Sequence, residues 1–270
     1  MGLRLLLATA VAAIPAASPP VEFLFRHQQP SGAFAETGGR PGPELTAWAV
    51  LGLRAAGAGT GGALAYLVAH EGALAEITDV ELVATAESAL GRKPARLLAR
   101  IRAAQRADGR IGPTVNSTIW GILALRQARE PAPRAAVRFV LRRQTRNGGW
   151  AWYVGGQPDS NDTAAAIEAL RSAGVTGAPI RRGLAYLRRL QNRDGGFELT
   201  PRRGSDAQST GWAVQAFLAA RRSPPRGALA YLRSLRRRDG SFRYSRRYAT
   251  TPVWVTAQVL PALARRPFPF

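Results

Sequence analysis

The sequence predicts an all-α protein in which six helical hairpins close into a single ring, an α6/α6 toroid. The first observation is a repeated turn, in which a glutamine is followed four residues later by glycine and shortly afterwards by an aromatic or apolar residue. The anchor positions, including two where another residue replaces glutamine, are Gln28, Glu71, Gln105, Gln144, Gln191 and Arg236. Their spacing of 34 to 47 residues is typical of a helix-pair repeat.

Each anchor closes a first helix. In Phe139 to Trp150 (FVLRRQTRNGGW) and Tyr186 to Phe197 (YLRRLQNRDGGF), apolar residues precede the glutamine at helical spacing. Glycine then follows, where the end of a helix favours positive φ. These helices carry arginine on one face, for example Arg188 and Arg189, which predicts that they lie on the outside.

The second helix of each repeat is apolar nearly all round and rich in alanine, which predicts a buried position. The predicted segments are Glu44 to Leu53, Glu81 to Leu90, Asn116 to Leu125, Asn161 to Leu170, Gln208 to Phe217 and Pro252 to Leu263. Six inner and six outer helices are the content of a closed toroid, whose inner helices are parallel and begin at one mouth. An open solenoid is the alternative, although neither end shows a polar capping repeat.

The first 18 residues predict a secretory signal peptide, which leaves residues 19–270 for the toroid. Arg4 precedes an apolar run from Leu5 to Ile14, and small residues follow around Ala17. The run is too short to span a bilayer comfortably, so we expect a secreted or cell-envelope protein that is not transmembrane. A buried N-terminal helix is the alternative interpretation.

Composition excludes several chemistries. The chain has no cysteine and two histidines, so we expect no disulfide, no thiolate zinc site, no metal and no cofactor. The formal net charge is +21, almost entirely from arginine. This charge favours an anionic envelope surface as a partner, or it reflects compositional bias alone. No segment resembles a nucleic-acid-binding module, so nucleic acid is not an expected partner.

The repeats QTRNGGW (Gln144 to Trp150) and QNRDGGF (Gln191 to Phe197) resemble the QW-type repeats of the squalene-hopene cyclase, terpene cyclase and prenyltransferase α/α-toroid superfamily. The resemblance covers roughly residues 19 to 265 and implies the toroid fold. The superfamily includes both enzymes and non-catalytic ligand-binding proteins. Without cysteine, the zinc site of protein prenyltransferases and the thioester of related domains are excluded. Cyclases of this class generally use two barrel domains, whereas this chain has material for one.

The resemblance also singles out Asp159 to Ala164 (DSNDTA). Class II terpene cyclases carry Asp-x-Asp-Asp-Thr-Ala at the start of an inner helix, and the middle aspartate protonates the substrate. Here that place is taken by Asn161, whose amide has no proton to give at accessible acidity. If the chain is a cyclase, the resemblance implies Asp159 or Asp162 as the catalytic acid.

The same pattern recurs at Thr114 to Thr118 and at Asp206 to Thr210, which favours a structural interpretation. We expect these side chains to cap inner helices, the caps being Asn116, Asn161 and Gln208 together with Ser117, Asp162 and Ser209. Three tryptophans at one repeat position are expected to pack between neighbouring helices, namely Trp48, Trp120 and Trp212. Only the fourth repeat clusters Trp150, Trp152 and Tyr153 beside Asp159.

These observations favour a non-catalytic, extracytoplasmic toroid that binds a small or isoprenoid-like ligand at the mouth formed by the inner-helix N-termini. The candidate ligand-binding residues are Trp150, Trp152, Tyr153, Asn116, Asn161, Asp206 and Gln208. Free N–H groups at that mouth suit an anionic or carbonyl-rich ligand. Two alternatives are a divergent class II-type terpene cyclase or mutase, and a platform that binds a protein or an acidic polymer.

Overall fold

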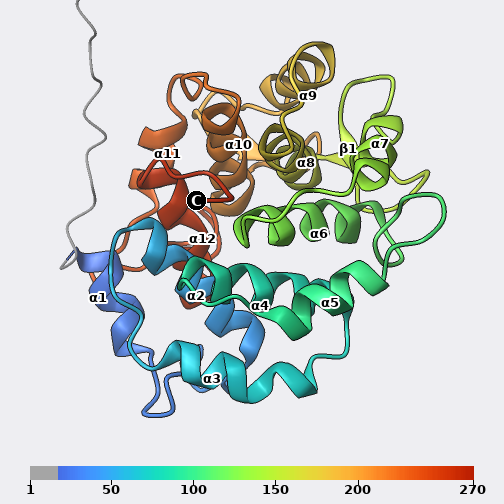
Figure 1. The fold of residues 1–270 in the computed structure, drawn as a ribbon. Coiled ribbons are helices and arrows are strands. Elements are labelled where there is room, and N and C mark those ends of the chain that lie inside the picture. Colours follow the sequence, from blue (N-terminus) through green and yellow to red (C-terminus); the bar gives the residue numbers. More distant parts are fainter. Residues whose placement is uncertain (1–17) are drawn as a thin grey trace, which may run out of the picture.

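The computed structural model describes residues 18–270, in which two sets of helices alternate along the chain (Figure 1). Residues 1–17, with nearly all of the predicted signal peptide, lie outside the described residues. The first helices of the repeats are α1 (Pro19–Arg26), α3 (Ala63–His70), α5 (Ala95–Ala103), α7 (Arg134–Arg142), α9 (Ala178–Arg189) and α11 (Ala228–Ser234). The second helices are α2 (Pro43–Ala55), α4 (Ile77–Ala89), α6 (Val115–Gln127), α8 (Ser160–Ser172), α10 (Ala207–Ala219) and α12 (Pro252–Leu263).

The second helices form a closed inner ring. Each packs against the next, and α12 packs against α2, so that the last inner helix meets the first. The outer helices α3, α5, α7, α9 and α11 each pack on the outside of the inner helix that precedes them in the chain. The outer helix α1 packs on α12. The predicted all-α toroid is therefore confirmed, and the open solenoid is wrong.

Burial follows the sequence pattern. The inner helices are buried along almost their whole length, and α6 is buried at all but one of its residues. The outer helix α9 buries Ile180, Leu184 and Leu187 on one side and exposes Arg181, Arg182 and Arg188 on the other. Burying apolar surface is the main stabilising term of such a fold.

The recurring residues hold the repeats together by the same hydrogen bonds each time. In five repeats, the threonine of the inner helix accepts a hydrogen bond from the backbone N–H of the residue after the glycine turn, as Thr163 does from Trp150 at 2.9 Å. The Gln144 amide donates to the carbonyl of Gly148 in its own turn and to that of Pro179 in the next repeat. Gly148 has φ of +94°, and a Cβ there would lie 2.6 Å from the Arg182 carbonyl oxygen, so glycine is required.

Two contacts between distant parts of the chain complete the ring. Glu36, in the first repeat, accepts hydrogen bonds from the backbone N–H groups of Val253 and Trp254 and thereby caps α12. After α12 the chain turns under the ring. There Phe268 donates its N–H to the Glu168 carboxylate at 2.8 Å, and Phe270 exchanges two hydrogen bonds with Gln127. This C-terminal segment covers the end of the ring opposite the inner-helix N-termini.

Short strands replace two of the loops expected from the sequence. β1 (Trp150–Ala151) pairs antiparallel with β2 (Pro158–Asp159), and β3 (Phe197–Glu198) pairs with β4 (Ser205–Asp206). Each pair sets an extended backbone directly before an inner helix. In the part of the chain that the structure describes, no helix has both the length and the apolar character to cross a membrane.

Candidate functional site

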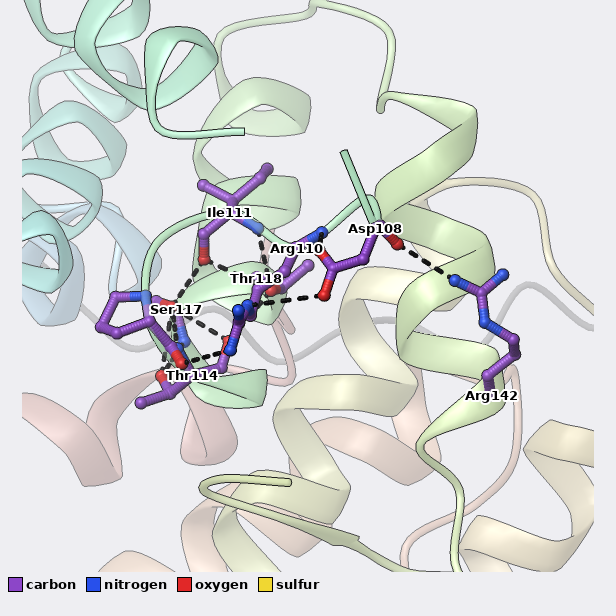
Figure 2. A network of polar contacts seen from close by, with 8 residues as sticks. Asp108, Arg110, Ile111, Thr114, Ser117, Thr118 and Arg142 are labelled. Atoms are coloured by element: carbon purple, nitrogen blue, oxygen red, sulfur yellow. Dashed lines mark hydrogen bonds and ion pairs between the residues drawn. The ribbon is translucent and has the colours of Figure 1, made fainter. Parts of the chain in front are cut away.

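Three of the inner helices, α6, α8 and α10, carry a side-chain cap at the N-terminus, shown for α6 in Figure 2. Thr114 is the N-cap: its side chain accepts from the Ser117 N–H at 2.9 Å, and Ser117 Oγ accepts from the Thr114 N–H. The Ser117 hydroxyl also donates to the Ile111 carbonyl at 2.6 Å, which ties the cap to the preceding turn. This reciprocal capping box satisfies donors that would otherwise be free.

Helices α8 and α10 are capped at the equivalent position by aspartates. Asp159 accepts from the Asp162 N–H at 2.8 Å, and Asp206 accepts from the Ser209 N–H at 2.7 Å. The expected assignment of caps to Asn116, Asn161 and Gln208 is therefore wrong, because the cap lies two residues earlier, where the backbone is still extended. The caps also occupy N–H groups that were expected to be free for an anionic ligand.

Since they do not cap, Asn116, Asn161 and Gln208 line a cavity of about 370 Å³ at the mouth of the ring. We call it the tryptophan cavity, because five of the six tryptophans of the chain contribute to it. Its lining residues are Trp48, Thr78, Asp79, Leu82, Asn116, Trp120, Trp152, Asp159, Asn161, Asp162, Ala165, Leu199, Gln208, Trp212, Trp254 and Gln258.

Three tryptophans from alternate inner helices meet in the middle of the ring. Trp48 of α2, Trp120 of α6 and Trp212 of α10 are pairwise edge to face, with ring centroids 5.5 to 6.2 Å apart. Phe268 packs against Trp120 and Trp212, so the C-terminal segment contacts this cluster directly. The three tryptophans thus pack together across the centre of the ring and not between neighbouring helices as predicted, and they also line the cavity.

The aromatic cluster of the fourth repeat divides between core and mouth. Trp150 is fully buried, donates its indole N–H to the Val140 carbonyl at 2.7 Å and does not line the cavity. Trp152 is 51% exposed and lines the cavity, with its carbonyl accepting from the Asn116 N–H at 3.0 Å. Tyr153 is exposed and lies outside the lining. Only Trp152 of the three is placed to meet a ligand in this cavity.

Asp159 and Asp162 form a coupled acidic pair on the cavity wall. Burial raises the pKa of both carboxyls, and the charge of Asp159 raises that of Asp162 further. The Asn116 amide donates to Asp162 Oδ1 at 2.7 Å and opposes this shift in part. Asp162 therefore holds a proton well above the pH at which an exposed aspartate would lose it.

A hydrogen-bond donor on the cavity wall has no partner among the described residues. Gln258 Oε1 accepts from the Trp212 indole N–H at 3.1 Å, and because that N–H can only donate, this contact fixes which end of the amide faces it. The Nε2 of Gln258 is then unpartnered, although the residue is almost fully buried. Buried donors in native proteins are normally satisfied, so this group points to a ligand.

The remaining predicted residue, Asp206, does not line the tryptophan cavity. It lines a separate cavity of about 360 Å³ with Tyr231, Tyr244, Arg203 and Arg246 among other residues. Burial raises the pKa of Asp206 to about 6, while the hydrogen bonds from Ser209 oppose that rise. Its two oxygens accept from the backbone and the hydroxyl of Ser209, which is a structural arrangement.

The residues of the tryptophan cavity that were not predicted as site residues include Asp79, Trp254 and Gln258. Trp254 lies in the first turn of α12, which begins with Pro252. A proline at the start of a helix is the signal that could have placed Trp254 near the mouth. Asp79 and Gln258 carry no comparable mark. Among residues 18–270, no three acidic or histidine side chains gather closely enough to hold a metal ion.

Comparison with solved structures identifies the same architecture elsewhere. A protein from Actinoplanes matches with a TM-score of 0.67 at 20% identity, over 92% of this chain and 97% of that chain. The type II terpene cyclase MstE from Scytonema matches with a TM-score of 0.70 at 16% identity, over 91% of this chain and 95% of MstE. The ent-copalyl diphosphate synthase from Streptomyces platensis matches with a TM-score of 0.61 at 19% identity, over 83% of this chain and half of the synthase.

These similarities show that the chain has the α/α-toroid fold of terpene cyclases, which confirms the resemblance at the level of fold. No protein-family model and no curated protein sequence matches the chain. MstE is covered almost completely, so a single toroid of this size is enough for a protein described as a type II terpene cyclase. The presence of a single barrel domain therefore does not argue against a cyclase of this class.

Proposed function

We propose that the protein binds an isoprenoid-like molecule in the tryptophan cavity. The observation that carries this proposal is the gathering of Trp48, Trp120, Trp152, Trp212 and Trp254 around one cavity of about 370 Å³. A partly closed cavity that combines aromatic and apolar walls with polar groups is typical of ligand sites of this size. Gln258 Nε2 supplies a donor to an oxygen of the ligand.

The structural neighbours support this choice of ligand class. Variants of MstE are described in complex with geranylgeranyl dihydroxybenzoate as substrate and with merosterolic acid A as product. One of them replaces an aspartate by asparagine and still holds the substrate. We extend the isoprenoid ligand, not the reaction, to this chain.

Binding is tested by titrating geranylgeraniol into the protein and following tryptophan fluorescence. Trp152→Ala is expected to weaken binding about tenfold, because it removes an indole from the mouth. Tyr153→Ala is the matched control from the same exposed loop and is expected to leave binding unchanged, since Tyr153 does not line the cavity. Equal effects of the two variants, or no binding, would contradict the proposal.

A second candidate function is a class II-type terpene cyclase that uses Asp162 as its acid. One observation favours it: Asp162 is buried beside aromatic rings on the cavity wall, and burial raises its pKa well above that of an exposed aspartate. The acid would give its proton to a terminal alkene, and the proton would return when the final carbocation loses one to form a new alkene.

The two candidates are separated by product analysis after incubation with geranylgeraniol and with squalene. Binding without a cyclised product supports the non-catalytic function, and a product that Asp162→Asn abolishes supports the cyclase. Asn161→Asp restores the full acidic motif of class II terpene cyclases. If a residual activity exists, this variant is expected to raise it.

We also propose that the protein acts outside the cytoplasm, on the strength of the first 18 residues of the sequence. Expression of the full chain in a secreting host, followed by N-terminal sequencing of the exported protein, tests this. A mature N-terminus near residue 19 is expected. Retention of the uncleaved chain in the cytoplasm would contradict the proposal.

A further inference from the structure

The tryptophan cavity differs in charge from the rest of the protein. The chain has 38 lysine and arginine residues against 17 acidic residues. The described residues that line the cavity nevertheless include three aspartates, Asp79, Asp159 and Asp162, and no arginine, lysine or histidine. In so basic a chain, a cavity without one cationic side chain is a local reversal of charge.

The acidic character continues beyond the cavity. An adjoining groove of about 420 Å³ shares Trp48 and Trp254 with the cavity and adds Glu36 and Glu44. Glu36 is engaged in capping α12, whereas Glu44 is exposed. Burial raises the pKa of Asp79, and the charge of Glu44 raises it further, so these two carboxylates lie close enough to interact. The side of the mouth formed by α2 and α4 therefore gathers carboxylates.

The aromatic rings favour the same sign of ligand charge. Indole faces attract cations because of their quadrupole, and groups of such rings are used to recognise quaternary ammonium ligands. The tryptophan cavity offers five indoles next to carboxylates. Gln258, 4% exposed with its Nε2 unpartnered, independently indicates that this cavity is shaped for a ligand.

We propose that the ligand is a cationic amphiphile, an apolar chain that carries an oxygen acceptor for Gln258 Nε2 and a tertiary or quaternary ammonium group. The ammonium lies at the mouth between the tryptophans and Asp79 and Asp159, and the apolar chain lies against the central indoles. This inference rests on the proposed isoprenoid-binding function and specifies the charge of its ligand. A prenyl phosphate or diphosphate would instead place its negative charge among carboxylates, with no cation on the wall to meet it.

Three probes with the same chain test the sign of the charge: farnesyltrimethylammonium, its neutral carbon isostere with a tert-butyl group, and farnesyl phosphate. Affinities are measured by tryptophan fluorescence at equal ionic strength. The ammonium probe is expected to bind about tenfold more tightly than the isostere. Farnesyl phosphate is expected to bind more weakly than the isostere.

Charge-neutralising variants then assign the preference to residues. Asp79→Asn and Asp159→Asn are expected to reduce the preference for the ammonium over the isostere severalfold while leaving affinity for the isostere nearly unchanged. Glu22→Gln is the matched control, because Glu22 is exposed on α1 and lines neither the cavity nor the groove. It removes the same charge from the protein and is expected to change nothing.

The outcomes distinguish a failure of the inferred charge preference from a failure of the proposed isoprenoid binding. If the isostere binds as tightly as the ammonium, or the phosphate binds most tightly, the charge preference is wrong and the isoprenoid site stands. A preference that both aspartate variants leave intact would also overturn the inference. If none of the three probes binds, the proposed function itself fails.

Discussion

The fourth and fifth repeats, residues 144–172 and 191–219, are built on nearly the same plan. Gln144 and Gln191 each donate to a carbonyl in their own turn and to one in the next repeat. Both turns lead into a short strand pair, and an aspartate at the end of that pair caps the inner helix, Asp159 in one case and Asp206 in the other.

The two repeats differ three residues into the inner helix. Ser209 donates its hydroxyl to the second oxygen of Asp206, so that the cap is complete within its own repeat. The fourth repeat has Asp162 there, whose pKa is raised by burial and by the charge of Asp159, and whose carboxyl group accepts a hydrogen bond from Asn116 of a neighbouring helix. The repeat thus keeps a second buried carboxyl that the cap does not need, and this carboxyl lies on the cavity wall.

The loops between the paired strands differ as well. In the fourth repeat the loop exposes Trp152, Tyr153 and Val154, whereas in the fifth it reads Thr-Pro-Arg-Arg-Gly from Thr200 to Gly204. Exposed aromatic surface costs solvation free energy and is retained where it contacts something else. Comparing siblings therefore separates residues that maintain the ring from residues available for a ligand.

The largest expected effect falls on a position that the repeats share. Trp150 and Phe197 follow the glycine turn in the two repeats, and both are fully buried. Trp150→Ala and Phe197→Ala are each expected to destabilise the protein by about 3–5 kcal/mol, because they leave cavities in the core. Urea unfolding followed by circular dichroism measures both.

Trp152→Ala is the control for this pair of variants. Because Trp152 is exposed, replacing it should reduce stability only slightly. A small effect of Trp150→Ala would contradict its assignment to the core. It would return Trp150 to the binding residues among which the sequence placed it.

An intermediate effect is expected at the caps. Asp206→Ala removes a satisfied N-cap and should cost about 1–2 kcal/mol. Asp159→Ala removes the equivalent cap but also relieves the repulsion of Asp162, so at neutral pH it should cost less. Thermal unfolding of both variants at pH 7 measures the difference. Equal costs would show that the acidic pair carries no strain.

The fold was predictable because its signals are repeated. Six copies of an apolar segment, each preceded by a glutamine and glycine turn, leave few architectures open, and errors in one copy are corrected by the others. Even the divergent anchor at Glu71 lies in register with the rest. The hydrophobic pattern decided which helix of each pair is buried.

The site was predictable only in part, because its details depend on backbone geometry. Asp159, Asn161 and Asp162 are all residues that favour helix caps, so composition could not select among them. The choice is made by the pairing of β2 with β1, which fixes an extended backbone at Asp159. Likewise, Trp150 and Trp152 are two residues apart in sequence, and only the end of β1 after Ala151 separates core from mouth.

The smallest and most specific effect should come from converting one repeat into its sibling. Burial and the charge of Asp159 raise the pKa of Asp162, so the folded protein binds this proton more tightly than the unfolded chain does. Below the unfolded pKa of about 4, both states are protonated and the carboxyl costs nothing. As pH rises toward the raised folded pKa, stability is lost. Asp162→Ser removes that loss, so the variant should have a higher melting temperature than the parent at pH 8.

The difference in melting temperature between Asp162→Ser and the parent should narrow as pH falls to 4, where the Asp162 carboxyl is neutral in both the folded and the unfolded state. The reciprocal variant Ser209→Asp should lose stability relative to the parent as pH rises, because it places a second carboxyl beside Asp206. Melting temperatures at pH 4, 6 and 8 test both variants. A difference in melting temperature that does not change with pH would mean that Asp162 differs from Ser209 only in packing. In that case the cyclase candidate loses the raised pKa that supports Asp162 as its acid.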